Sequence, residues 1–554
     1  MSEIAAEMPA PNGIAPAAVG LAHRRVLAII GALMLGMFLA ALDQTIVSTA
    51  LPTIVADLHG ASHISWVVTA YLLAATVSTP LWGKLGDQYG RKSFFQASIL
   101  LFLAGSILSG AATSMLMLIV CRALQGLGSG GLMVGAQAII GDVVPPRDRG
   151  RYQGMFGATF GVATVIGPLL GGVLVTDLTW RWIFYVNVPI GALALVVIAS
   201  RVPGHLSRVR HEIDYVGIVV LSLGVAALVL LTSLGGTTYA WASAPIIVMA
   251  VGGGLLLVAW CVVERAAREP VLPLHLFAIR AFSATSLVGF IVGFAMFGAL
   301  TFLPLYYQDV HGASPTSSGL RLVPLMAGLL IVSIVSGQVI SRTGRYRAFP
   351  IAGTAVMTVG MWLLSRVTPT TSTLVQYLDL VVLGFGLGAV MQVLVLVAQN
   401  AVPQREIGVA TAGATFFRSI GGSFGAAIFG AIFSNIFAGR LVKALRALHL
   451  TTSSSFAGGN AASLSPSTLA HLPAPVHDAF VSAYSVSLQD VFLVAVPICG
   501  LAFVVTFLLP RVEFRRTLSG GPEPQQAAAA DGRGPAMAGH TAAPGGAAAG
   551  VRID

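Results

Sequence analysis

The chain has 554 residues, of which 56% are hydrophobic and only 9% are charged. Soluble domains carry about 25% charged residues, so this composition indicates a polytopic membrane protein and argues against a soluble one. The formal net charge is +10, but the basic residues recur in short clusters between apolar runs, which argues against a nucleic-acid partner. Three isolated cysteines, Cys121, Cys261 and Cys499, form neither a disulfide framework nor a zinc site, and we interpret them as small packing residues.

Fourteen apolar segments are long enough to cross a hydrocarbon core of about 30 Å. A polar stretch of 23 residues precedes the first apolar segment. This segment is too long for the core of a signal peptide, so we expect it to be an uncleaved span. The segments cover residues 26–51, 64–82, 94–113, 115–140, 153–175, 183–200, 214–234, 244–263, 281–305, 319–340, 349–367, 374–399, 407–437 and 488–510.

The loops between these segments alternate in charge. Basic loops such as 83–92, 145–151, 201–211 and 341–347 fall on one side, and the opposite loops carry almost no Lys or Arg. The positive-inside rule then places both termini in the cytoplasm and predicts a multi-pass protein of the cytoplasmic (inner) membrane.

The sequence also contains an internal repeat. The hexapeptide DLHGAS (57–62) after the first span is matched by DVHGAS (309–314) after the ninth, and other paired motifs keep nearly the same offset. Two related halves facing a midplane cavity are typical of transporters. We therefore expect an all-α fold of two six-helix bundles plus two inserted helices. The expected parts are a cytoplasmic tail (1–24), an N-terminal bundle (25–200), inserted helices 7 and 8 (201–270), a C-terminal bundle (271–516) with a long outer loop (438–487), and a disordered cytoplasmic tail (517–554).

One acid lies inside the first span. Asp43 is the single charge between Val26 and Leu51, and an acid at such a depth costs about 2.5–3.5 kcal/mol on insertion scales. The repeat aligns Asp43 with Ala295, so the six-helix unit does not itself require an acid here. Arg122, the second intramembrane charge of the N-terminal half, is its expected partner, and Gln125 shares the helical face of Arg122.

The loop after the second span reads GKLGDQYGRK (83–92). We expect its acid, Asp87, to cap the N-terminus of a helix in the other half, and Arg91 to pair with an acid such as Asp142. A tight turn is expected to need Gly86 and Gly90. The alternative is a basic loop that only sets topology. The full motif resembles the loop 2–3 signature of the major facilitator superfamily, in which these residues form a cytoplasmic gate: Gly83, Gly86, Asp87, Gly90, Arg91 and Asp142.

The fourth and fifth spans carry two further motifs. Arg122, in CRALQGLGSGG, is followed by glycines that permit close helix packing, and its pattern resembles the fourth-helix motif of proton-coupled members of that superfamily. A buried structural arginine is the alternative. The fifth span contains GATFGVATVIGPLLGG, which resembles the motif of its antiporters. The residues of this antiporter motif are Gly161, Gly167, Pro168, Gly171 and Gly172.

Two more stretches, LDQTIVSTALPTIV and WRWIFYVNVPIG (180–191), resemble signatures of the fourteen-helix drug:proton antiporters of the EmrB/QacA type, over about residues 25–510. This resemblance implies a proton-coupled antiporter that exports amphipathic or cationic small molecules across the cytoplasmic membrane. It assigns proton coupling to Asp43, with Arg122 as its modulator. A major facilitator exporter of one endogenous metabolite, such as a self-made antibiotic, siderophore or lipid precursor, is the alternative.

No nucleotide-binding loop, nucleophile elbow or metal cluster is found, so we expect neither an enzyme nor a cofactor, and the proton gradient would supply the energy. The expected partners are drug-like molecules, protons and the lipid bilayer. We expect a functional monomer, with a periplasmic adaptor in a double-membrane bacterium.

Further residues are weaker candidates. Arg418 is deep enough to need a partner, and the spacing of His59 and His63 would suit a metal only on a helix. Asp379 is a candidate second acid, with a membrane-edge residue as the alternative. Substrate-pocket candidates chosen from position are Trp66, Tyr71, Gln125, Phe156 and Asp379.

Overall fold

The computed structural model describes residues 23–58, 64–145, 148–202, 214–236, 239–447 and 473–511. These residues are almost entirely helical, with one isolated β-bridge between Gly235 and Tyr239. The expected terminal tails fall almost wholly outside the described residues, as do His59 and His63.

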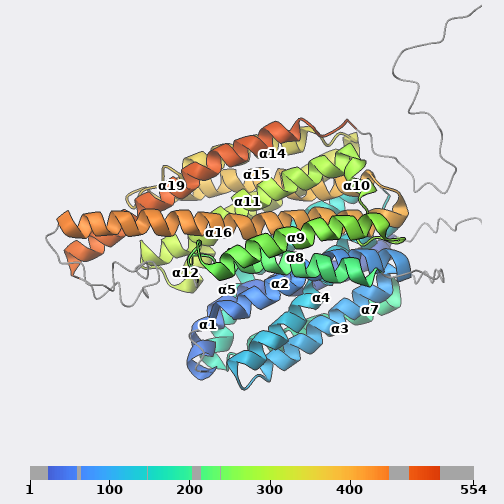
Figure 1. The fold of residues 1–554 in the computed structure, drawn as a ribbon, viewed down its shortest axis with the longest axis horizontal. Helices are drawn as coiled ribbons and strands as arrows, with labels where there is room; N and C mark the ends of the chain where they lie inside the picture. Colours follow the sequence, from blue (N-terminus) through green and yellow to red (C-terminus); the bar gives the residue numbers. More distant parts are fainter. Residues whose placement is uncertain are drawn as a thin grey trace, which may run out of the picture. The chain divides into compact units, whose positions relative to one another are not determined.

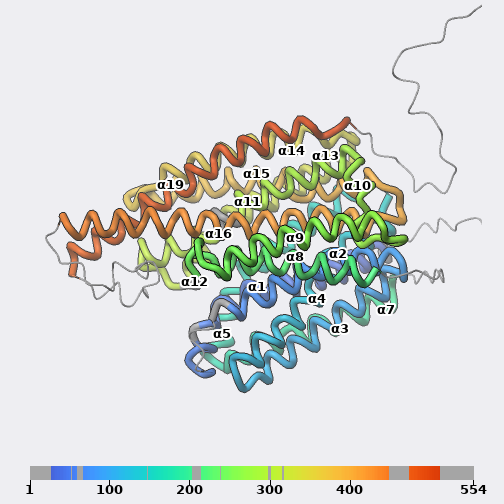
Figure 2. Tube along the Cα trace, in the orientation of Figure 1, coloured from blue at the N-terminus to red at the C-terminus, as the bar shows by residue number. Residues whose placement is uncertain are grey.

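Figures 1 and 2 show the helices in sequence colours. The N-terminal half comprises α1 (His23–Leu58), α2 (Ile64–Tyr89), α3 (Arg91–Gly110), α4 (Met115–Val143), α5 (Arg149–Asp177), α6 (Trp182–Tyr185) and α7 (Asn187–Arg201). Two inserted helices follow, α8 (Tyr215–Leu234) and α9 (Ala244–Ala266). The C-terminal half comprises α10 (His275–Ala278), α11 (Arg280–Asp309), α12 (Pro315–Leu320), α13 (Val323–Thr343), α14 (Ala348–Leu364), α15 (Thr373–Asn400), η2 (Gln404–Glu406), α16 (Ile407–Ala447) and α19 (Ala474–Thr506).

The two halves meet along two helix pairs. Helix α5 packs along α13, and α2 packs along α16. The inserted helices α8 and α9 pack on each other, and α8 also contacts α2 and α16 (Figure 2). The inserted pair therefore lies against one of the two seams between the halves.

Close packing inside the N-terminal half depends on the glycines of α4. A Cβ atom at Gly126 would lie 3.0 Å from the Tyr71 carbonyl carbon of α2, and one at Gly128 would lie 2.8 Å from Phe102 Cα of α3. Such distances leave no room for a side chain, because they are shorter than van der Waals contact. The predicted close approach of neighbouring backbones to α4 is thus confirmed.

Twelve helices in the described part of the chain are long and apolar enough to cross a membrane. Each of the fourteen predicted segments overlaps a helix, but α2 is absent from the twelve, and α14, with 17 residues, is a shorter apolar helix. The predicted all-helical fold is confirmed at the level of the two related bundles, while the count of fourteen spans stays a prediction.

The predicted outer loop 438–487, which was expected to have short helical pieces at its ends, begins and ends in helix. Helix α16 continues to Ala447 and α19 already begins at Ala474, so residues 448–472 alone lie outside the described part of this segment. The extensions are held together by edge-to-face aromatic contacts, with the Phe437 ring centre 5.2 Å from that of Phe480 and 5.6 Å from that of Tyr484. An ion pair of 2.6 Å between Arg440 and Asp490 adds to this contact. Burial of these rings explains why the two helices extend beyond the predicted apolar segments.

Several basic loops that sequence analysis placed on one side do lie at one end of the bundle. Lys92 donates hydrogen bonds to the carbonyls of Ala199 (2.8 Å) and Val202 (2.7 Å), which joins loop 83–92 to the end of α7. Ser341 donates to Asp148 at 3.0 Å, which joins loop 145–151 to loop 341–347. We call this end of the molecule the Asp87 end.

Candidate functional site

Asp43 lies near the middle of α1 and is fully buried within the N-terminal half. Its carboxylate accepts hydrogen bonds from Arg122 Nη1 at 2.5 Å, from Gln125 Nε2 at 2.8 Å and from Asn187 Nδ2 at 3.4 Å. Ser106 supports the site by accepting from Asn187 at 3.0 Å. Three donors around one acceptor fit an ionised carboxylate, which has no proton to donate.

Arg122, on α4, is the buried counter-charge of Asp43, with 1% of its surface exposed. Its Nη1 also donates to Gln125 Oε1 at 2.8 Å, and its Nε reaches the Val67 carbonyl at 3.4 Å. The guanidinium carbon lies 4.2 Å from the centre of the Tyr71 ring, a cation–π contact. The predicted partnership of the two charges is confirmed as a contact, and a carboxylate rather than backbone carbonyls balances the arginine.

The charge balance of this cluster depends on whether Asp43 is ionised. With Asp43 ionised, the pair is neutral and hydrogen-bonded, which a buried charge requires. Protonation of Asp43 would leave Arg122 with a buried, uncompensated charge. The guanidinium would then need another acceptor, which would require a rearrangement around α4.

The glycines of α5 allow this helix to pack closely on α1, which carries Asp43, and on α13 of the other half. Thr45, two residues beyond Asp43, donates to the Ala163 carbonyl at 3.1 Å. A Cβ at Gly167 would collide with Thr45, and one at Gly171 would stand 3.1 Å from Ile46. On another face of α5, a Cβ at Gly161 would lie 3.3 Å from Leu330 of α13.

The remaining members of the predicted antiporter motif lie on the same helix. Pro168 contacts α12, since a Cβ at Gly319 would lie 3.1 Å from it, and Gly172 also belongs to α5. Helix α5 is therefore packed tightly between α1 of its own half and α13 of the other.

At the Asp87 end, Asp87 of α2 caps a helix of the opposite half. Its two carboxylate oxygens accept from the backbone N–H groups of Gly408 at 3.0 Å and Val409 at 2.8 Å, in the first turn of α16. A negative charge is favourable there because the first N–H groups of a helix have no intrahelical partner and the helix dipole is positive at that end. The predicted cap is confirmed as a contact.

Arg91, the first residue of α3, joins several groups around this cap. It forms ion pairs with Asp87 at 2.6 Å and with Asp142 at 2.5 Å. It also donates to the carbonyls of Ala138 at 3.0 Å and Gln404 at 2.9 Å. Since Gln404 belongs to the C-terminal half, Arg91 connects the two halves. Within the N-terminal half it connects α3 to α2 and α4.

The glycines of this loop have different roles. Gly90 has a φ of +105°, which favours glycine. A Cβ at Gly83 would lie 2.5 Å from Ala412 Cβ and 2.7 Å from the Gly408 carbonyl oxygen, so Gly83 permits contact with α16. The expected requirement for Gly86 in a turn is wrong, because α2 continues to Tyr89 and a Cβ at Gly86 meets nothing closer than 3.7 Å.

A set of buried glutamines lies between the two halves and was not among the predicted site residues. Gln399 of α15 donates to the Gln137 carbonyl and to Thr411 Oγ1, both at 3.0 Å, and its Oε1 accepts from Gln153 at 3.4 Å. Glutamine in an apolar span was the available signal. These bonds extend the contact between the halves from the Asp87 end into the bundle.

The proposed pocket residues do not gather around one cavity. Tyr71 and Gln125 belong to the Asp43 cluster, Phe156 is buried in the core of the N-terminal half, and Trp66 is half-buried on α2. Asp379 is buried on α15 in the other half, with 7% of its surface exposed. Arg418 is half-buried on α16.

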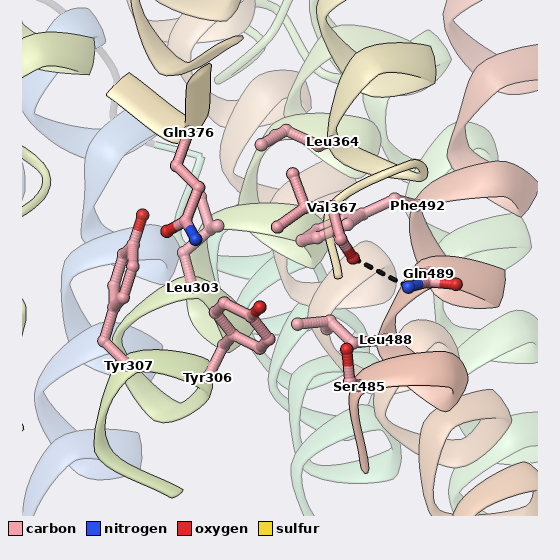
Figure 3. A pocket seen from close by; sticks show the side chains of 10 residues that line it. All are labelled: Leu303, Tyr306, Tyr307, Leu364, Val367, Gln376, Ser485, Leu488, Gln489 and Phe492. Carbon is pink, nitrogen blue, oxygen red and sulfur yellow. Dashed lines mark hydrogen bonds between the residues drawn. The ribbon is translucent and has the colours of Figure 1, made fainter. Parts of the chain in front are cut away.

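A small cavity does occur in the C-terminal half, between α11, α14, α15 and α19 (Figure 3). Tyr306, Tyr307 and Gln376 line one side of it, and Leu488 and Phe492 line the other. Asp379 is not among its lining residues. This cavity lies inside one bundle, whereas a translocation pathway would run between the two.

Asn187 was missed although its stretch was recognised. The sequence WRWIFYVNVPIG gave a signature without indicating which residue faces Asp43. An asparagine directly before an apolar helix normally reads as a cap, and here it is the first residue of α7 and fully buried.

The structure thus has two helical bundles, joined by the contacts of Asp87 and Arg91 that we call the latch, with a buried ion pair in one of them. The model of the Major Facilitator Superfamily matches residues 33–426, and the chain belongs to this family.

Relatives and solved structures agree with this assignment. The chain is 47% identical to the uncharacterized MFS-type transporter Rv1877 of Mycobacterium tuberculosis, over 87% of this chain and 69% of that protein. It is 40% identical to the multidrug transporter protein MdtP of Bacillus subtilis, over 78% of this chain and 81% of that protein. A structure of the proton:xylose symporter XylE aligns with a TM-score of 0.58 at 14% identity, over 89% and 98% of the two chains, and so shares the fold.

Proposed function

We propose that this transporter is a proton-coupled antiporter that exports amphipathic or cationic small molecules, and that it is of the fourteen-helix drug:proton type. The observation that carries the proposal is the buried Asp43–Arg122 pair, which the six-helix unit does not itself require. The name of the MdtP relative supports a multidrug substrate range.

In the proposed cycle, Asp43 alternates between an ionised form paired with Arg122 and a protonated form. When the pathway faces the cytoplasm, Asp43 loses its proton and the site favours a cationic substrate. When the pathway faces outward, Asp43 takes up a proton and the substrate is released. Protons thus enter the cell as substrate leaves it.

The latch around Asp87 would set which side is open. By the positive-inside rule the Asp87 end is cytoplasmic, and both termini share that side of the cytoplasmic membrane. The contacts of Asp87 and Arg91 with α16 and Gln404 would then hold that side closed. We propose that the monomer is the functional unit, since each monomer holds one ion pair and one latch.

Transport by purified protein in proteoliposomes tests the proposal. Vesicles with an acidic lumen should accumulate ethidium, a cationic amphipathic probe, through molecules inserted inside-out, and a protonophore should abolish accumulation. Empty liposomes give the control. Accumulation that persists without a pH gradient but needs ATP would contradict proton coupling. Export of a single compound from a wide panel would instead favour a dedicated metabolite exporter.

A further inference from the structure

The inserted helices carry two acids that the transport cycle above does not use. Asp214 precedes α8 and Glu264 lies in the last turn of α9, so both occupy the same end of this helix pair. Each carboxyl group holds one backbone N–H through one oxygen. Asp214 Oδ1 accepts from Gly217 at 2.8 Å, and Glu264 Oε1 accepts from Leu272 at 2.6 Å.

The second oxygens of the two acids both lie near Gly217. A Cβ at Gly217 would collide with Asp214 Oδ2 and would lie 3.1 Å from Glu264 Oε2, so both oxygens approach the same point. Both atoms are buried and have no hydrogen-bond partner among the described residues. Glu264 as a whole is only 3% exposed.

A third buried polar atom lies beside Glu264. The Trp260 indole nitrogen is one turn before Glu264 on α9, interacts with its carboxyl group, and also has no partner in hydrogen-bond geometry. Trp260 is 8% exposed. Two unpartnered carboxylate oxygens at close range repel each other when both are ionised, and burial removes the water that would screen them.

Among the described residues, which do not include 203–213 directly before Asp214, no basic side chain forms an ion pair with either acid. Arg265 and Arg268 are exposed, and Glu269 is engaged with Lys84 of α2 at 3.7 Å. Asp87 of α2 is engaged in the latch. Arg418 is the charged residue on residues 407–437 of α16. Of all these groups, Asp214 is the one whose charge acts on Glu264.

We propose that Asp214 and Glu264 form a second proton-binding site, in which the pair of carboxyl groups takes up one proton. The proton bonds to an oxygen of one carboxyl group, so the pair carries a single negative charge. The site lies beside the segment that joins α9 to the C-terminal half, because Glu264 also holds Leu272. It does not depend on the role of Asp43.

Infrared spectroscopy of the purified full-length protein in lipid nanodiscs tests the site directly. The wild type should show a protonated carboxylic acid band that disappears as the pH is raised, and Glu264→Gln should lose that component. Asp177→Asn, at an exposed acid on the other side of the bundle, is the control and should keep it. An unchanged titration in Glu264→Gln would overturn the proposal.

A second variant guards against loss of fold. Asp214→Asn can still cap α8, and it should keep the band but move its midpoint to lower pH by roughly one unit or more, because the neighbouring charge is gone. An unmoved midpoint would contradict uptake of the proton by the pair. Removal of the band by sodium at constant pH would show a cation site instead. Neither infrared measurement requires transport, so this test can fail without failure of the proposed function, and the reverse also holds.

Discussion

At the scale of single residues, the Asp43 cluster explains why an acid can persist in a membrane helix. Its charge is balanced by Arg122 and its lone pairs are used by Gln125 and Asn187. Removal of one partner from a buried pair costs about 3–5 kcal/mol, because the other charge is left uncompensated. Substitutions here therefore report on both stability and coupling, and conservative changes separate the two.

Arg122→Lys should reduce efflux driven by a pH gradient by about ten- to a hundredfold. Lysine keeps the charge but cannot serve Asp43, Gln125 and the Tyr71 ring together, and a lost charge-assisted hydrogen bond costs about 1.5–3 kcal/mol. The assay is ethidium efflux in proteoliposomes at matched protein content. Arg181→Lys, in the half-exposed pair with Asp57, is the control and should transport normally. Full activity of Arg122→Lys would show that guanidinium geometry is unimportant.

Asn187→Ala should lower the activity less than Arg122→Lys does. It removes one neutral donor at 3.4 Å from Asp43 and its bond to Ser106, each worth about 0.5–1.5 kcal/mol. Thermal unfolding and efflux measured together distinguish the two effects. A variant with intact efflux would limit Asn187 to a packing role.

The sequence was sufficient to predict the Asp43–Arg122 pair because both charges stand out in apolar spans. It was not sufficient for Asn187, since an asparagine near a helix start has a common local use as a cap. Glu264 was hidden for a related reason: it lies in the segment ERAAREP, whose arginines dominate the reading of the loop.

At the scale of helices, α2 and α16 form a seam that depends on glycine at one position and on charge at another. Gly83 brings the two backbones together, and Asp87 binds the first turn of α16. The capping interaction could be predicted from the loop motif. The length of α2 could not, because a glycine such as Gly86 normally weakens a helix prediction, while tertiary contact with α16 keeps the helix intact to Tyr89.

Gly83→Ala and Gly86→Ala make a matched pair of variants. The first should lower the melting temperature and the efflux rate, since its Cβ would lie 2.5 Å from Ala412 Cβ. The second should be neutral or stabilising by up to about 1 kcal/mol, because alanine favours the helix and meets only ordinary contacts. Equal effects of both substitutions would show that the α2–α16 contact does not depend on Gly83.

Asp87→Asn should shift the protein toward a state open at the Asp87 end. The variant keeps hydrogen-bonding capacity but loses the charge that interacts with the α16 terminus and Arg91. Spin labels at Asp148 and Ser341, which are in contact in this structure, report the separation by pulsed electron paramagnetic resonance. A longer distance is expected in Asp87→Asn, and the wild-type distribution in Asp177→Asn. An unchanged distance in Asp87→Asn would contradict the latch.

At the scale of the whole molecule, two six-helix bundles meet along α5–α13 and α2–α16, and the ion pair lies within one bundle. The repeat in the sequence was enough to predict the two bundles and the inserted helices. Short helical pieces were expected at the ends of the outer loop, but the full lengths of α16 and α19 were not, because the edge-to-face contacts of Phe437 with Phe480 and Tyr484 join residues far apart in the sequence. Coupling then requires that events at Asp43 reach the contacts between the bundles, and α5 is the helix that touches both.

The central claim is that Asp43 carries the transported proton. Its direct test is the proton flux that ethidium elicits in proteoliposomes containing a pH-sensitive dye, compared between wild type and Asp43→Asn. Asparagine keeps the size of the side chain and resembles the protonated acid, so the variant should still fold. Ethidium should dissipate the pH gradient in liposomes with the wild type. In liposomes with Asp43→Asn, the loss of the gradient should be no larger than in empty liposomes. Proton flux of wild-type size in Asp43→Asn would contradict it.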